Sequence, residues 1–136
     1  MYDLIIKNGT IIDGTGREAY KADICVLGDK IAGIGIFQYE LAKTEIDATG
    51  LIISPGFIDV LNHSDTYLTL FTMPSQESLL TQGVTTIIGG NCGYSLAPLV
   101  SGNALETVQK WANPDQINID WLKMSEFLDC LSAKKM

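Results

Sequence analysis

Apolar and polar residues alternate over residues 2–7 with the period of two that is typical of β-strands, and the first third of the chain as a whole favours β-structure. Turn residues separate short apolar runs, and Gly28-Asp29 is a two-residue connection that favours a tight hairpin. Asn8-Gly9 and Ala48-Thr49-Gly50 predict two further turns, and Asp13-Gly14-Thr15-Gly16 predicts a loop. The expected strands cover residues 2–7, 10–12, 22–27, 30–35, 45–47 and 51–53. This succession of short strands and turns indicates a β-sandwich portion over residues 1–54.

The pattern changes at Ser54-Pro55-Gly56, where runs that are apolar without alternation begin. Residues 57–61 predict a short strand, and residues 84–88 predict a second, β-branched one. Between them, residues 75–82 predict a helix with Ser75 as its N-cap and Gly83 at its C-terminal stop. Strand, helix and strand joined by short connections form a βαβ unit, whose two strands are parallel.

The chain closes with an expected amphipathic helix over residues 125–133, with Ser125 as its N-cap and Glu126 in its first turn. No clear strand follows residues 84–88, whereas a complete parallel barrel needs about 250 residues. We therefore expect an α/β fold in which residues 55–136 are only the start of a barrel. Because the chain begins with Met1, the missing part is expected to be C-terminal.

Composition and charge narrow the class of protein. Hydrophobic residues make up 46% and charged residues 18% of the chain, which is typical of a globular protein. A net charge of −7 repels phosphate backbones and argues against nucleic acid as a partner. The uncharged stretch 78–105 is interrupted by Gly, Asn and Pro, so it does not predict a membrane span, and no signal peptide precedes it. An odd number of cysteines indicates reduced thiols and a cytoplasmic location.

Two residues follow the carboxyl ends of predicted parallel strands, where the active sites of parallel α/β folds lie. His63, the only histidine, follows the first predicted parallel strand, and Cys92 follows the second. Since the carboxyl ends of neighbouring strands meet at one rim, we expect both side chains to overlook a common pocket. Imidazole and thiolate are good ligands for Zn²⁺. The alternatives are a locally hydrogen-bonded loop histidine and a small buried thiol; for Cys25 and Cys130 packing is the expected role.

Several stretches, taken in order over residues 3–98, resemble the amidohydrolase superfamily. The last of them resembles specifically the N-acyl-D-amino-acid deacylase, or D-aminoacylase, branch. The stretches that carry the resemblance are Asp3–Gly16, Gly28–Gly35, Asp47–Val60, Gln82–Gly93 and Ser95–Pro98.

The resemblance implies a β-sandwich built from both chain ends and a distorted (β/α)₈ barrel between them. This chain would supply the sandwich portion 1–54 and the first two βα units of the barrel in residues 55–136. The implied reaction is zinc-dependent hydrolysis of the linear amide of a small N-acyl-D-amino acid to a carboxylate and a D-amino acid. Bound zinc would polarise the scissile carbonyl and lower the pKa of a bound water towards about 7.

The resemblance also assigns metal ligands. Cys92 corresponds to the cysteine that holds the tightly bound zinc together with histidines from later strands. The family motif Asp-x-His-x-His starts at Asp59, so His63 corresponds to its second histidine. The catalytic Asp is expected beyond Met136, which would leave no catalytic residue in this chain and the chain alone inactive.

One position departs from the family pattern. Leu61 stands where the first histidine of the motif is expected, and an aliphatic side chain cannot bind a metal. A second metal site is therefore in doubt, while a one-zinc site on Cys92 is still possible. Two other classes stay open. One is a cyclic-amide amidohydrolase of the dihydropyrimidinase or hydantoinase type, against which Leu61 and Cys92 argue; the other is a non-catalytic β-rich binding module.

Overall fold

The protein combines β-sheets with short helices in a mixed α/β structure. The computed structural model describes residues 1–99, 106 and 109–134. The chain divides into two compact units, Met1–Pro55 and Gly56–Met136. Within the described parts of the chain, no helix has the length and the apolar character needed to cross a membrane.

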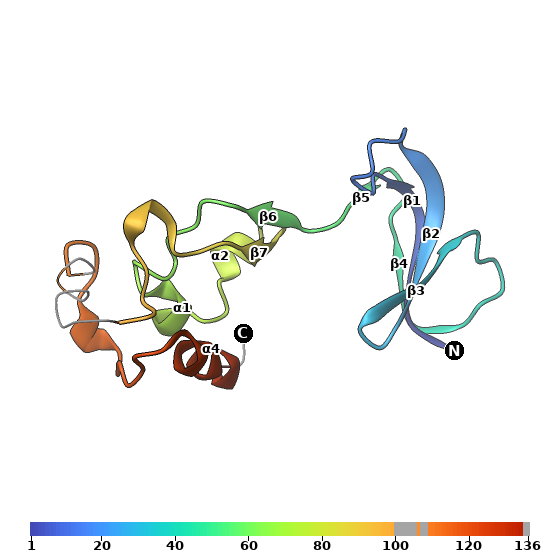
Figure 1. Ribbon diagram of the computed structural model, residues 1–136. Helices are drawn as coiled ribbons and strands as arrows, with labels where there is room; N and C mark the ends of the chain where they lie inside the picture. The colour runs from blue at the N-terminus through green and yellow to red at the C-terminus, as the bar shows by residue number, and fades with distance from the viewer. Residues whose placement is uncertain (100–105, 107–108, 135–136) are drawn as a thin grey trace. The chain divides into compact units, whose positions relative to one another are not determined.

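The first unit is a single five-stranded sheet in which β3, β2, β1 and β4 follow one another, with β5 also paired to β1 (Figure 1). β2 lies antiparallel to β1 and β3, whereas β4 and β5 both run parallel to β1. The strands are β1 (Tyr2–Ile11), β2 (Tyr20–Leu27), β3 (Lys30–Gly35), β4 (Ala42–Asp47) and β5 (Ile52–Ile53). The expected hairpin is confirmed, since Leu27 pairs with Lys30 across Gly28-Asp29.

The predicted turn at Asn8-Gly9 is wrong, because β1 continues through it. The register of β1 against β2 shifts between Ile6 and Gly9, and Asn8 has a φ of 64°, which makes this position a β-bulge. Tertiary hydrogen bonds hold the bulge: Asn8 Nδ2 donates to Asp47 Oδ1 over 2.9 Å, and Asn8 N donates to Asp23 Oδ1 over 2.8 Å. The donated side-chain bond lowers the pKa of Asp47.

The second unit contains the predicted pair of parallel strands, β6 (Phe57–Asp59) and β7 (Val84–Ile87), which are shorter than expected. The connection holds two one-turn helices, α1 (Thr69–Thr72) and α2 (Glu77–Leu80), in place of the single predicted helix. The prediction of Ser75 as the N-cap is wrong; the cap residue is Gln76, at a φ of 45°. Gln76 Nε2 donates hydrogen bonds to the carbonyl oxygens of Thr69 and Met73. These bonds hold Gln76 against α1, and α2 begins at the next residue.

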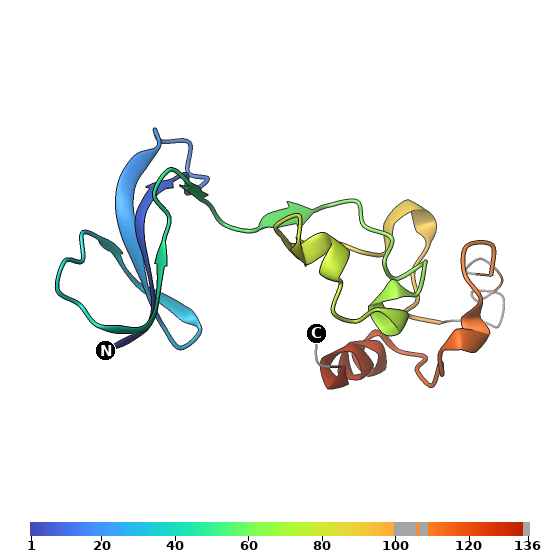
Figure 2. The same cartoon turned by 180° about the vertical axis from the view of Figure 1, so that it is seen from behind.

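The core of this unit lies between α1 and α4 (Met124–Ala133), which are side by side in both views (Figures 1 and 2). Trp121 is 1% exposed and stacks on Phe71 of α1 with the ring centroids 5.2 Å apart. The buried cluster comprises Leu68, Leu70, Phe71, Leu96, Ala97, Trp121 and Phe127. The prediction of Ser125 as the N-cap of α4 is wrong: the cap residue is Lys123, because Glu126 Oε2 accepts hydrogen bonds from the backbone N–H groups of Leu122 and Lys123.

Gly56 is required for the close approach of β6 and β7. A Cβ at this position would clash with Thr85 Oγ1 and lie 2.7 Å from Thr85 Cβ, an atom whose position the backbone fixes. We expect Gly56→Ala to lower the free energy of unfolding by about 2 kcal/mol, the usual penalty of overpacking. Urea denaturation, monitored by tryptophan fluorescence, measures the free energy of unfolding of this unit, which holds both tryptophans. Adding Thr85→Ala should recover part of the loss; equal stability of the single and double variants would contradict a clash with Thr85.

Candidate metal centre

The two loops that follow β6 and β7 are hydrogen-bonded to each other beyond the ends of the strands. Ile88 N donates to Asp59 O over 2.9 Å, and Asn62 N donates to Ile88 O over 3.2 Å. Asn91 Nδ2 then bridges both loops by donating to the carbonyl oxygens of Asn62 and Ile88. The parallel pairing therefore carries on into the loops and brings residues 62–65 against residues 88–92.

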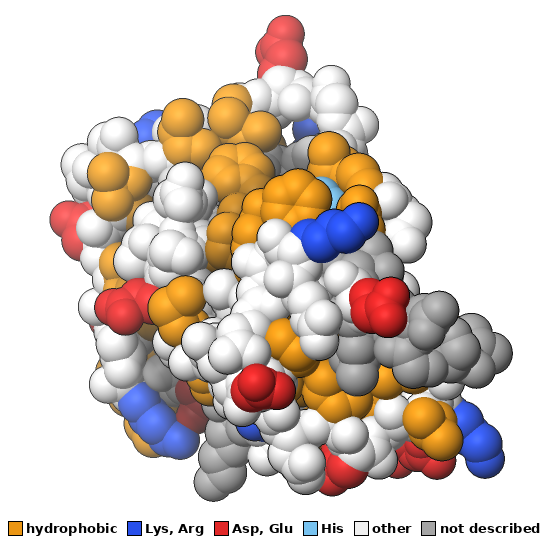
Figure 3. Space-filling view, turned by 90° about the vertical axis from the view of Figure 1, so that its left-hand side faces the viewer, with side chains coloured by type: hydrophobic (Ala, Val, Ile, Leu, Met, Phe, Trp, Pro, Cys, Tyr) orange, Lys and Arg blue, Asp and Glu red, His pale blue; other side chains and the backbone are white. Residues whose placement is uncertain are grey.

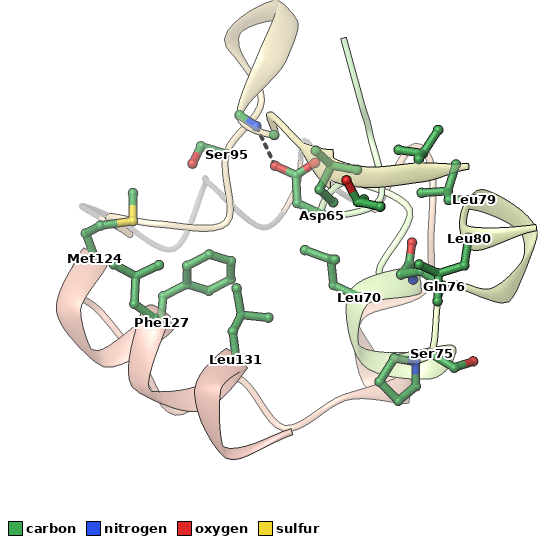
Figure 4. A pocket seen from close by; sticks show the side chains of 17 residues that line it. Asp65, Leu70, Ser75, Gln76, Leu79, Leu80, Ser95, Met124, Phe127 and Leu131 are labelled. Carbon is green, nitrogen blue, oxygen red and sulfur yellow. Dashed lines mark hydrogen bonds between the residues drawn. The ribbon is translucent and has the colours of Figure 1, made fainter. Parts of the chain in front are cut away.

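Asp65 forms the deepest link between the loops. It is 5% exposed, and its Oδ2 accepts a 2.7 Å hydrogen bond from Gly90 N, dashed in Figure 4. Its Oδ1 accepts a 2.8 Å bond from Thr66 N. A Cβ on Gly89 would lie 3.1 Å from Oδ2, so a glycine lets the backbone approach the carboxylate. Asp65 was not among the predicted site residues, although it lies two positions after His63.

This arrangement brings the two predicted site residues together. His63 Nε2 lies 3.8 Å from Cys92 Sγ. Cys92 has a φ of 58° and Gly90, two residues earlier, a φ of 75°, so the loop turns in the left-handed region; the thiol is exposed. His63 is partly buried.

The separation of the two atoms fits a shared zinc ion. With bonds of about 2.3 Å to sulfur and about 2.05 Å to nitrogen, a tetrahedral angle places the two ligand atoms about 3.6 Å apart. The 3.8 Å in the structure is within reach of that value without a rotamer change. Among the described residues, no group of three or more His, Cys, Asp or Glu side chains could hold a metal ion. Leu61, at the motif position before His63, is 61% exposed. The described chain thus offers two ligands of a possible metal site.

The imidazole and the thiol line a recess of about 150 Å³, which three aromatic side chains complete. Tyr67 and Tyr94 both meet Trp111 edge to face, with centroid distances of 5.9 and 6.1 Å. On the surface the histidine, pale blue in Figure 3, lies among hydrophobic side chains. These aromatic residues were not among the predicted site residues.

A larger cavity of about 610 Å³ opens on the other side of Asp65. Figure 4 shows Phe127 and Leu131 of α4 facing Leu70 across it, with Asp65 at one margin. Neither His63 nor Cys92 lines this cavity. The candidate chemistry is therefore confined to the smaller, aromatic recess.

Comparison with known proteins decides the family. No protein-family model matches the chain. The chain is 44% identical over 102 residues to a D-aminoacylase of Alcaligenes xylosoxydans xylosoxydans, covering 75% of this chain and 21% of that protein. It superimposes on a D-aminoacylase structure, studied for its binuclear metal centre, with a TM-score of 0.79 and 36% identity over 98% of this chain and 27% of the other. The chain belongs to the D-aminoacylase family of amidohydrolases.

The relatives in this family are enzymes, and the chain spans only about a quarter of their length. Another member, the N-acyl-D-glutamate deacylase of Bordetella bronchiseptica, was solved with zinc and a phosphonate inhibitor (TM-score 0.70, 43% identity, 75% of this chain and 21% of that one). The hydantoinase alternative is more distant: an L-hydantoinase of Arthrobacter aurescens gives a TM-score of 0.58 and 27% identity over 82% of this chain and 25% of that one.

Proposed function

We propose that this chain supplies part of the metal centre of a zinc-dependent deacylase that hydrolyses the linear amide of N-acyl-D-amino acids. The observation that carries the proposal is the 3.8 Å separation of His63 Nε2 and Cys92 Sγ at the carboxyl ends of two parallel strands. The known D-aminoacylases support the substrate class, because their names describe this reaction.

The fold proposal follows from the same relatives. Residues 1–54 form part of a composite β-sandwich, and residues 55–136 form the first two βα units of a (β/α)₈ barrel. The five-stranded sheet of the first unit and the parallel β6–β7 pair of the second support this division. Exposed apolar residues on the second unit, such as Phe57 and Ile58 at 62% and 60%, are suited to contact further barrel strands.

The chemical contribution of the chain is to hold and orient the metal ligands. Cys92 binds as a thiolate and His63 through the lone pair of neutral Nε2, so metal uptake releases protons and strengthens with rising pH. Asp65 keeps the two loops in register through Gly90 N. A zinc ion held there would polarise the scissile carbonyl and activate a water molecule. We place the enzyme in the cytoplasm, which suits the three free thiols.

The described chain offers only two ligands, so we propose that it binds zinc weakly and does not turn over N-acyl-D-amino acids by itself. Cobalt(II) reports such a site directly, because a cysteine thiolate gives it a charge-transfer absorption band. Titrating Co²⁺ into the chain should produce this band. Cys92→Ala should abolish it, and His63→Ala should weaken the affinity by at least about tenfold, the usual effect of removing a ligand contact.

Leu61 allows a gain-of-function version of the same test. Leu61→His would restore the Asp-x-His-x-His pattern and should tighten Co²⁺ binding by about tenfold or more, since a third ligand is added. Val60→His is the matched control: Val60 is adjacent and 64% exposed, but it does not occupy a histidine position of the Asp-x-His-x-His pattern. Equal affinities of the two histidine variants, or a band that survives Cys92→Ala, would refute the proposed ligands.

A further inference from the structure

The recess beside the thiol and the imidazole has a composition that selects its occupant. Its walls are Thr66 and the three aromatic side chains of Tyr67, Tyr94 and Trp111, with His63 and Cys92 at one side. Trp111 is 48% exposed and contacts both tyrosines edge to face, so it forms the outer wall. The aromatic walls offer apolar surface to a ligand, and the tyrosine hydroxyls allow hydrogen bonds at the rim.

Charge decides which half of an N-acyl-amino acid can enter. The scissile carbonyl carries an uncharged acyl group on one side and, on the other, an amino acid whose carboxylate needs a cationic partner. None of the six described residues that line the recess is Lys or Arg. The recess therefore suits the acyl group, while the carboxylate would stay outside it.

Volume limits the length of that group. A cavity of 150 Å³ is the size that accepts a benzene-sized guest, roughly six non-hydrogen atoms. An acetyl or butyryl group fits within this volume, whereas an octanoyl chain exceeds it. Extra methylene groups beyond about six atoms would remain in water and add no binding free energy.

We propose that Tyr67, Tyr94 and Trp111 form an acyl-binding recess that directs short, uncharged acyl groups to the proposed metal ligands. This inference rests on the proposed function, since it assumes that the substrate carbonyl is held at His63 and Cys92. Trp111 is then a specificity-determining residue, contributed by the segment that follows the Cys92 loop.

Proton–nitrogen NMR of the indole groups tests this inference in metal-free buffer. The chain has two tryptophans: Trp111 lines the recess, while Trp121 is buried and donates to Leu96 O, so its signal reports an intact fold. Acetamide and N-acetyl-D-leucine should shift the Trp111 signal, and D-leucine should not. N-butyryl-D-leucine should bind more tightly than the acetyl compound, and N-octanoyl-D-leucine no more tightly than N-butyryl-D-leucine.

Variants test whether the response of the Trp111 signal comes from binding in the recess or from another part of the chain. Tyr94→Ala should weaken N-acetyl-D-leucine at least about fivefold, as judged by the Trp111 signal, because part of the aromatic wall is lost. Tyr94→Phe should restore most of the affinity. Tyr39→Ala, which removes an 89% exposed tyrosine of the other unit, should have no effect. Shifts with D-leucine equal to those with N-acetyl-D-leucine, or no shift of Trp111 with any acyl compound, would overturn the proposal.

The cobalt titration distinguishes the two proposals. Cobalt binding by His63 and Cys92 without any acyl response at Trp111 would retain the metal ligands and reject the recess. An acyl response without cobalt binding would retain a binding recess and reject the metal centre.

Discussion

Trp121→Ala is expected to lower the free energy of unfolding of the second unit by about 4 kcal/mol, the usual loss for truncating a buried tryptophan. Trp121 is 1% exposed and packs between Phe71, at 5.2 Å between ring centroids, and Phe127, at 5.4 Å. It is also tied to the segment after the Cys92 loop, because its Nε1 donates to Leu96 O over 2.7 Å. Since small domains are stable by only about 5–15 kcal/mol, this loss is a large part of the total.

Trp111→Ala is the matched control for this prediction. Both tryptophans lie in the same unit, but Trp111 is 48% exposed, so its removal should change the stability by less than about 1 kcal/mol. The remaining tryptophan reports unfolding by fluorescence in each variant. The loss of stability in Trp121→Phe should lie between those of the two alanine variants. Phenylalanine keeps an aromatic ring but leaves the Leu96 carbonyl without its donor, at a cost of about 1–3 kcal/mol. Similar losses for Trp111→Ala and Trp121→Ala would contradict the assignment of the core.

The hairpin and the parallel strand pair could be predicted because their signals are local. Gly28-Asp29 is a short connection between two apolar runs, and Leu27 pairs with Lys30 as expected. The placement of His63 and Cys92 at one rim follows from strand order alone, since parallel strands end on the same side. Neither inference needs knowledge of distant side chains.

The errors arose where side-chain hydrogen bonds override a local preference. Asn8-Gly9 is a strong turn signal, but Asp23 and Asp47, far along the chain, fix Asn8 as a bulge inside β1. Ser75 is a good N-cap by type, yet the bonds from Gln76 to α1 set the start of α2 one residue later. The position of Trp111 near Cys92 could not be predicted from the sequence, because it depends on which loop lies beside Cys92.

Asp65→Ala tests whether the loops position the metal ligands. The carboxylate is 5% exposed and bonds to Gly90 N on one oxygen and Thr66 N on the other. Removing it leaves the N–H groups of Gly90 and of buried Thr66 without their acceptor, so the free energy of unfolding should fall by about 2 kcal/mol. Because Gly90 is then released from the His63 loop, Co²⁺ affinity should also fall by about tenfold, as is usual when a residue that orients a ligand is lost.

Asp65→Asn sharpens the test, because an amide has the same shape but only one acceptor oxygen. Whichever way the amide is turned, its NH₂ group faces either Gly90 N–H or Thr66 N–H, and two donors repel. Asp120→Asn is the control, as this carboxylate is exposed on the same unit. If Asp65 acts by joining the loops, Asp65→Asn lowers both stability and Co²⁺ affinity, whereas Asp120→Asn changes neither. Loss of stability with unchanged Co²⁺ affinity would show that Cys92 and His63 find each other without this bond, and the ligand pair would then be held by the β6–β7 backbone alone.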